Sequence, residues 1–236
     1  MNREVSAAVD AMNASTHTLQ RTIGDLRDDQ AREPSLLPDW TRGHVLTHVA
    51  RNADALCNLV MWARTGVETP MYTSRERRSA DIEAGSGRPA NELVRDVTES
   101  HERLGAAIAE VPDEAWETEI TWGKDGRRSA AALIPKLRRV EVEVHHVDLD
   151  LDYTLANLPS DFVLSLLART ANDLSEREDL AGFVLVGNDN EGRWTVGAGG
   201  PEITGTPPSL LGWLLGRTDG IGVHSEGPLP HLGPWR

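Results

Sequence analysis

Two stretches decide how this chain is expected to fold: Asp39-Trp40-Thr41-Arg42-Gly43-His44-Val45-Leu46-Thr47-His48 and Val140-Glu141-Val142-Glu143-Val144-His145. The first offers Asp39 or Thr41 as a helix N-cap and leads into apolar residues at nearly helical spacing. It therefore predicts a helix, and Gly66 is a natural place for that helix to end.

The stretch that ends at His145 has two interpretations. Its strict alternation is also typical of a half-exposed β-strand, which would turn Glu141, Glu143 and His145 toward water. We favour a helix, because Pro135 suits a first helical turn and residues 136–149 contain no Gly, Pro or Asn.

A helix would make this stretch part of a metal site. Glu141 and His145 lie four residues apart, so a helix places them on one face with both side chains reaching the same point. His48 would come from the first helix, and two histidines with one carboxylate are typical ligands of a catalytic metal with an open coordination position. His44 shares a face with His48 and is the second choice of ligand. His146 points away from His145 and is expected beside the ligands or at the surface.

Apolar residues at helical spacing predict four helices in the N-terminal part of the chain. Four amphipathic helices suit a bundle that holds a metal in its core. The connection between the second and third helix, residues 66–89, is longer than a bundle needs, which predicts a binding loop or lid. The predicted helices cover about residues 3–26, 41–64, 90–110 and 136–150.

The pattern changes after Leu158-Pro159 to short strands and helices, which indicates a small α+β domain. We therefore divide the chain into a bundle over residues 1–155 and a smaller domain over residues 156–236. The elements expected in the smaller domain are a helix at about 160–174, strands at 182–187 and 193–197 joined by a turn at 188–192, a strand at 202–205 and a helix at 209–216.

The composition excludes several kinds of partner. The chain has 236 residues, a formal charge of -13 and a pI near 5.0, which argues against nucleic acid and anionic membranes, because phosphate binding needs clustered Lys and Arg. It has no apolar run that could span a bilayer and no signal-peptide pattern, so we expect a cytoplasmic protein, and a monomer. The one cysteine, Cys57, lies in an apolar stripe and is expected to be a small buried hydrophobe.

Several stretches resemble one family. Residues 37–50, 55–59 and 65–72 are similar to the mycothiol-dependent maleylpyruvate isomerases, and the resemblance resumes at 141–149 and 216–223. It implies an N-terminal DinB-like four-helix bundle that binds zinc and a smaller C-terminal α/β domain. It also implies a small-molecule substrate and mycothiol as the thiol cofactor.

The resemblance also implies roles for individual residues. It places the zinc ligands at His48, Glu141 and His145, a catalytic arginine that binds a substrate carboxylate at Arg217, and a second substrate arginine at Arg78. The implied reaction converts maleylpyruvate to fumarylpyruvate by addition of a metal-bound thiolate, rotation and elimination.

Three alternatives stay open at this point. A mycothiol-dependent S-transferase acting on another electrophile would share the metal and the thiol. An Fe(II) oxygenase uses the same ligand types, although usually on a β-barrel. A non-catalytic binding protein with a structural metal would need a fourth ligand, for example His44 or Glu143. Glu143 and Val144 also stand where the family has a tryptophan, and the roles of Glu143 and His146 are open.

Overall fold

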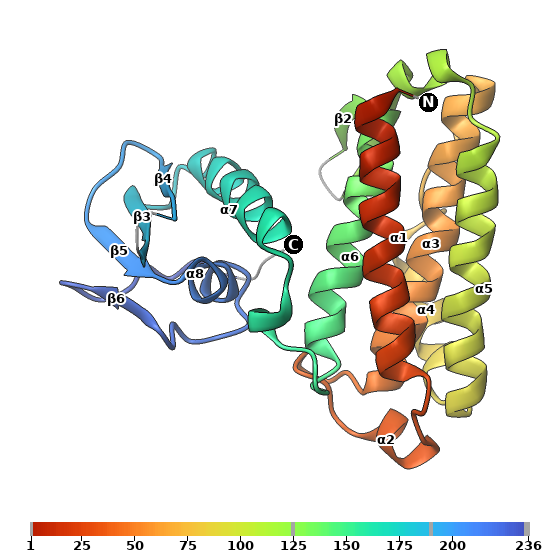
Figure 1. Cartoon of the computed structure of the whole chain (residues 1–236), viewed down its shortest axis with the longest axis horizontal. Helices are drawn as coiled ribbons and strands as arrows, with labels where there is room; N and C mark the ends of the chain where they lie inside the picture. The colour runs from red at the N-terminus through yellow and green to blue at the C-terminus, as the bar shows by residue number, and fades with distance from the viewer. Residues whose placement is uncertain (1, 124–125, 189–190, 234–236) are drawn as a thin grey trace. The chain divides into compact units, whose positions relative to one another are not determined.

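The computed structural model divides into two compact units, Met1–Asp152 and Tyr153–Arg236, which are described separately (Figure 1). Among the described residues, no helix combines the length and the apolar character needed to cross a membrane. The described residues are 2–123, 126–188 and 191–233.

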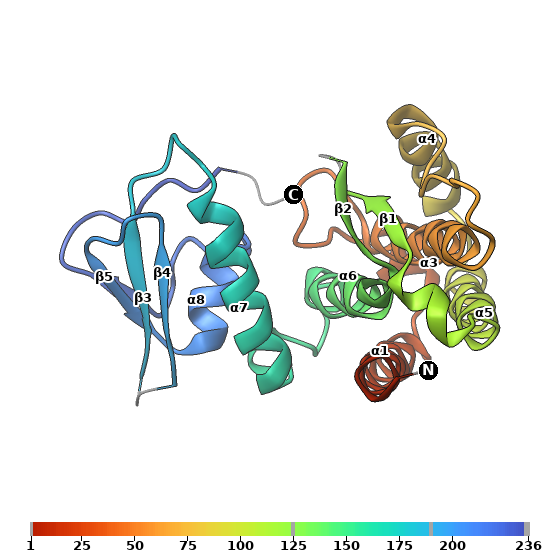
Figure 2. The same ribbon diagram turned by 90° about the horizontal axis from the view of Figure 1, so that it is seen from above.

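Long helices build the first unit. Figure 2 shows them nearly end-on, packed side by side as a bundle. Helix α1 lies against α5 and α6, and α3 lies against α5 and α6. A helical first domain is therefore confirmed. The helices are α1 (Arg3–Ile23), α3 (Arg42–Thr65), α5 (Ala90–Ala109) and α6 (Ile134–Asp148).

Local sequence explains where these helices begin and end. The Thr41 hydroxyl caps α3 by accepting from the backbone N–H of His44 at 3.4 Å. Helix α3 ends at Gly66, which adopts the left-handed conformation with a φ of 72° that glycine tolerates best. Pro135 lies in the first turn of α6, where its missing N–H costs nothing. The helix predicted for the stretch 140–145 is confirmed.

Two apolar clusters form the core of the bundle, and buried polar residues lie between them. Along α3, Ala50 belongs to one cluster and Ala53 to the other; along α6, Val142 and Leu137 are divided in the same way. Burial of each large aliphatic side chain in these clusters contributes about 1.5–3 kcal/mol to stability. The polar layer that separates the clusters consists of Ser15, Thr16, Asn52, Ser100, His101 and Arg138.

The connection expected as a loop over residues 66–89 contains a helix, α4 (Arg75–Ser86), which packs against α3. Close packing there depends on Gly43, since a Cβ atom at that position would lie 2.1 Å from the Ser86 carbonyl oxygen. The expectation of a loop was wrong because α4 buries little apolar surface, with Ile82 as its buried residue. Other short elements absent from the prediction are α2 (Asp28–Arg32) and the antiparallel strands β1 (Glu119–Trp122) and β2 (Arg127–Ala130).

The second unit is a four-stranded sheet with helices α7 and α8, which confirms the expected small α/β domain. The strand order is β4-β3-β5-β6, with β3 parallel to β5 and the outer pairs antiparallel. The turn expected at 188–192 includes Asp189 and Asn190, which lie outside the described residues. The elements are α7 (Ser160–Ser175), β3 (Phe183–Gly187), β4 (Arg193–Val196), β5 (Glu202–Gly205), α8 (Pro207–Leu214) and β6 (Val223–Ser225).

Candidate metal centre

The bundle brings His48, Glu141 and His145 together at one point. The Nε2 atom of His48 lies 3.0 Å from Oε2 of Glu141 and 3.0 Å from Nε2 of His145, and the latter two atoms are 3.4 Å apart. Tetrahedral zinc with ligand bonds of about 2.0–2.2 Å holds its ligand atoms about 3.3 Å apart. The three side chains therefore have the spacing of three ligands around one small metal ion.

Each ligand is held by the helix that carries it. Glu141 and His145 stack one turn apart on α6, while His48 projects from α3 across the interface between the helices. The Trp40 ring packs against the His48 ring with centroids 5.7 Å apart and an interplanar angle of 63°. Trp40 also lines a surface groove of about 410 Å³ formed by residues 34–41.

Asp148 completes the centre and was missed from the sequence. Its Oδ2 lies 2.8 Å from Nδ1 of His145, and its side chain is fully buried. A carboxylate in this position holds the proton on Nδ1, so that Nε2 presents its lone pair toward a metal. The signal was available, because Asp148 follows His145 by three residues on the same helix and so shares its face.

The charges of the three residues suit metal binding. Burial and the nearby His145 lower the pKa of His48 to about 4, against the opposing effect of Glu141. Burial alone would raise the pKa of Glu141, but hydrogen bonds from His145 and His48 hold it well below its usual range. For His145, burial is outweighed by Asp148 and Glu141, which raise its pKa. At neutral pH the site thus offers a carboxylate and a neutral His48 as donors.

Arg78 contacts the centre from helix α4. Its Nη2 lies 3.0 Å from Nδ1 of His48, and its guanidinium carbon lies 5.6 Å from the centre of the Tyr72 ring. Arginine only donates hydrogen bonds, so Nδ1 of His48 must accept here and the ring proton must lie on Nε2. The arginine predicted from the loop region is therefore adjacent to a predicted ligand.

The other candidate ligands lie elsewhere. His44, the second choice of ligand, has Nδ1 2.8 Å from the Thr41 hydroxyl and Nε2 3.2 Å from Glu83. Glu143 accepts from the Ser15 hydroxyl on α1 at 2.5 Å. Among the described residues, neither belongs to a potential metal-binding group.

His146 differs from its expected place beside the ligands or at the surface. The side chain is fully buried, and its Nε2 lies 2.8 Å from the Thr22 hydroxyl on α1. The expectation was wrong because the 100° step from His145 turns this residue into the interface between α6 and α1.

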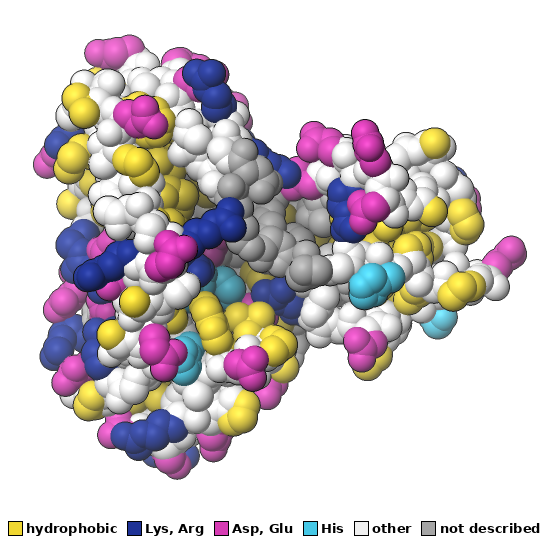
Figure 3. Space-filling view, turned by 180° about the vertical axis from the view of Figure 1, so that it is seen from behind, with side chains coloured by type: hydrophobic (Ala, Val, Ile, Leu, Met, Phe, Trp, Pro, Cys, Tyr) yellow, Lys and Arg dark blue, Asp and Glu magenta, His cyan; other side chains and the backbone are white. Residues whose placement is uncertain are grey.

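The centre is open to small molecules. The side chains of Glu141 and His145 keep 34% and 12% of their surface exposed. Figure 3 shows histidine side chains set into the surface of the helical unit beside hydrophobic side chains. A ligand can therefore approach the point where the three donor atoms meet.

Comparison with known proteins decides the family. The family profile described as "Mycothiol maleylpyruvate isomerase N-terminal domain" matches residues 12–150. The chain belongs to the mycothiol maleylpyruvate isomerase family. It is also similar to the crystal structure of the mycothiol-dependent maleylpyruvate isomerase, with 30% identity, a TM-score of 0.92 and all of both chains covered. A histidine-to-alanine mutant of that enzyme gives 30% identity, a TM-score of 0.91 and the same coverage.

The search of curated proteins finds no match. Membership of the mycothiol maleylpyruvate isomerase family confirms the resemblance seen in the sequence, and it makes the chain an enzyme. It also accounts for the two-unit fold, since the match to the solved isomerase extends over the whole chain.

Arg217, the remaining candidate, lies in the second unit, just after α8. Its Nη1 donates to the Leu215 carbonyl oxygen at 2.7 Å, and its backbone N–H donates to Gly212 at 2.8 Å. The side chain is half-buried. Its assignment to a substrate carboxylate, which the family resemblance implies, stays a prediction.

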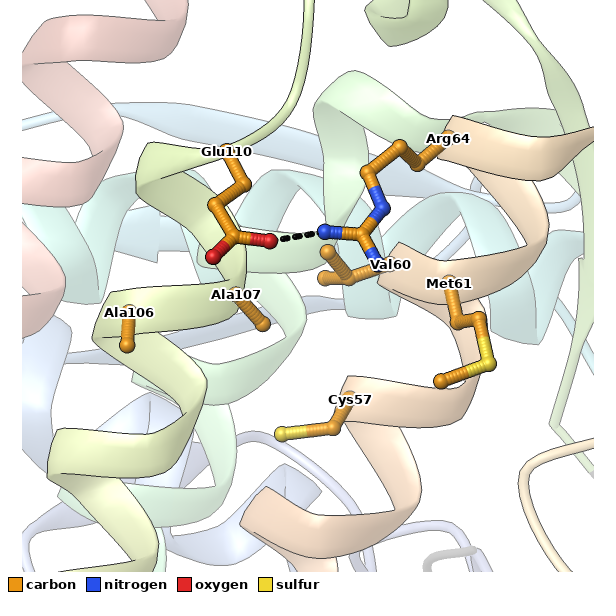
Figure 4. Close-up of a pocket in the computed structure, with 7 residues that line it drawn as sticks. All are labelled: Cys57, Val60, Met61, Arg64, Ala106, Ala107 and Glu110. Carbon is orange, nitrogen blue, oxygen red and sulfur yellow. Dashed lines mark hydrogen bonds and ion pairs between the residues drawn. The ribbon is translucent and has the colours of Figure 1, made fainter.

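Cys57 lies on a different side of α3 from the metal centre. It lines a groove of about 250 Å³ between α3 and α5, with an ion pair of Arg64 and Glu110 at one end (Figure 4). Burial and the neighbouring Asp54 raise the pKa of the Cys57 thiol, which makes it a poor nucleophile. The side chain is half-buried instead of fully buried as expected, but the expectation of a non-nucleophilic cysteine agrees with this environment.

Proposed function

We propose that this enzyme is a zinc- and mycothiol-dependent cis-trans isomerase that converts maleylpyruvate to fumarylpyruvate. The observation that carries the proposal is the convergence of His48, Glu141 and His145 on one point, in a chain whose family profile and solved relatives are named for this reaction. These names belong to the relatives, and the reaction of this chain is our inference from them.

The donor set fits a catalytic zinc ion. Two neutral imidazoles and one carboxylate are common ligands of catalytic zinc, whereas structural sites are closed by four protein ligands. Within the parts of the chain that the structure describes, the group contains three residues and no fourth. This favours a catalytic ion over the structural metal considered from the sequence.

The bound groups and the protein have separate tasks. When bound, zinc and mycothiol would supply a thiolate at neutral pH as the nucleophile for the isomerisation. His48, Glu141 and His145 would hold the metal, and Asp148 would keep the proton of His145 on Nδ1. The protein therefore orients the reactants and supplies no nucleophile of its own.

Arg78 gives the site a group for a carboxylate. A metal on Nε2 of His48 requires the ring proton on Nδ1, and the contact with Arg78 would then bring two donors together. Arg78 must therefore leave His48 when a metal binds, which frees its guanidinium for the substrate. We propose the same carboxylate-binding role for Arg217 in the second unit, where it would also stabilise the negative charge of an enolate.

A coupled spectroscopic assay tests this function. Zinc-loaded protein is mixed with maleylpyruvate, with and without mycothiol, and the formation of fumarylpyruvate is followed. We expect isomerisation that depends on the thiol. A product that retains the thiol would identify an S-transferase instead. Absence of thiol binding to the zinc-loaded protein would contradict both thiol-dependent reactions.

A further inference from the structure

Arg138 is a fully buried arginine in the polar layer of the bundle. Its Nη1 donates to the Val49 carbonyl oxygen at 2.6 Å and to Oδ1 of Asn52 at 2.9 Å. Its Nε and Nη2 atoms have no hydrogen-bond partner among the described residues. Burial lowers the pKa of Arg138 to about 10, so the guanidinium stays charged at neutral pH. The charged guanidinium of Arg138 thus has two N–H donor groups on one edge, Nε and Nη2, that make no hydrogen bond to the described residues.

That edge is the one with which arginine binds carboxylates. Elsewhere in this chain, Arg27 binds Asp29 through Nε and Nη2, both at 3.1 Å. Arg177 binds Asp179 through the same two atoms at 3.1 and 2.6 Å. Nε and Nη2 form a planar fork whose two parallel hydrogen bonds match the two oxygens of a carboxylate. Buried donors of this kind are almost always satisfied, so the free fork of Arg138 points to a ligand.

The fork lies one helical turn from the metal centre. Arg138 precedes Glu141 by three residues on α6, and Asn52 follows His48 by four residues on α3. Among the charged groups that raise the pKa of Arg138, Glu141 has the largest effect. A carboxylate on the fork would therefore lie beside the metal ligands, close enough for a small diacid to reach both places.

We propose that the Nε–Nη2 edge of Arg138 is a carboxylate subsite of the active site, which binds one carboxylate of a dicarboxylate substrate. The inference rests on the proposed function for the identity of the substrate. The side chain is closed to solvent here, so a carboxylate reaches it when a neighbouring segment moves. Residues 66–74 have no helical or strand structure, and Tyr72 of this segment lies beside Asn52. This segment is the one we expect to open.

Arg138→Lys tests the subsite, because lysine keeps the charge and one donor but has no fork. Maleate, a cis-dicarboxylate, is titrated calorimetrically into the zinc-loaded protein without mycothiol, so that no thiol addition accompanies binding. We expect at least tenfold weaker maleate binding and unchanged zinc affinity. The control is Arg51→Lys on α3, whose Nη2 is already paired with Asp54 and Asp96; its maleate binding should not change. Unchanged maleate binding by Arg138→Lys, or a loss of zinc by this variant, would overturn the subsite.

A measurement on the unmodified protein removes any dependence on how the variant folds. The Nε–H signal of Arg138 is assigned in a ¹H–¹⁵N spectrum of the zinc-loaded protein by correlating it through the side-chain carbons with the backbone of Arg138. Addition of maleate or acetate should shift it. A shift in a protein that does not isomerise maleylpyruvate supports the subsite and contradicts the proposed reaction. Isomerisation without a shift from either anion contradicts the subsite alone.

Discussion

Helix α6 carries the same residue types on two of its faces, but among the described residues only one of these faces belongs to a group that could hold a metal ion. Glu141 and His145 face α3, where Nε2 of His48 lies 3.0 Å from a donor atom of each. Glu143 and His146 face α1. Each face therefore offers a carboxylate and an imidazole from neighbouring turns.

The difference lies in the helix that faces each pair. On the α1 side, the Ser15 hydroxyl donates to Glu143 at 2.5 Å, and the Thr22 hydroxyl lies 2.8 Å from His146. Each of these contacts joins one side chain of α6 to a separate hydroxyl of α1. On the α3 side, Nε2 of His48 is a third atom that can bind a metal, and it lies 3.0 Å from the donor atoms of both Glu141 and His145. The partner helix, more than the pattern on α6 itself, decides which face can bind a metal.

The sharpest test of this comparison exchanges the carboxylates of the two faces for amides. We expect Glu141→Gln to weaken zinc binding by more than about 100-fold, because changes to groups behind metal ligands already cost 10–100-fold and this one removes a ligand charge. Glu143→Gln keeps an acceptor for Ser15 and should leave the zinc affinity unchanged. Both are measured by competition with a chelator of known affinity. Equal losses in the two variants would show that the faces are not distinct.

A smaller effect is expected from Asp148, which belongs to the α3 side. Asp148→Asn retains an acceptor for Nδ1 of His145 but loses the charge that supports this ring as a ligand. We expect zinc affinity to fall by about 10- to 100-fold, or about 1.4–2.7 kcal/mol. The control is Asp152→Asn, an exposed aspartate near the end of the same unit. If the two variants bind zinc equally well, Asp148 does not orient His145.

The sequence predicted the metal-binding face because its signals are local. Glu141 and His145 are one helical turn apart, and the helix that carries His48 has a cap, an apolar period and a glycine stop. Asp148 was overlooked, although its spacing of three residues from His145 was visible in the sequence. Arg138 was not predicted, since a polar residue within an apolar helix face looks the same in a sequence whether it is solvated or buried. Their roles depend on which atoms of other side chains meet them.

The same reasoning explains the elements that were missed. Helix α4 has a hydrophilic composition, and its position is set by close contact with α3 at Gly43 and Gly85. Strands β1 and β2 have four residues each, which is too short for a clear alternation. Strands β3, β4 and β5 of the second unit were predicted, and β3 gives the clearest signal as a run of apolar residues between Gly182 and Gly187. Strand β6 has three residues and was not predicted.

The smallest effect concerns the α1 side and depends on pH. Burial lowers the pKa of His146 from its ordinary value of 6.5 to about 4, so the unfolded chain binds a proton more readily than the folded one between these values. Stability from this residue is therefore complete above pH 6.5 and is lost as pH falls toward 4. We expect His146 to account for about 2 kcal/mol of the loss in unfolding free energy between pH 7 and pH 5.

His146→Gln isolates this contribution, because the amide can still bond to the Thr22 hydroxyl but does not titrate in this range. Urea unfolding of the metal-free protein at pH 7 and pH 5 gives the two free energies. The variant should lose less stability on acidification than the parent protein. Some loss should remain in both proteins, because both keep other buried histidines such as His101, whose pKa is lowered to about 4. An equal loss in both proteins would mean that His146 takes up its proton without leaving the α1 interface. The two faces of α6 would then differ in the geometry of their donor atoms, but both could hold a charged side chain.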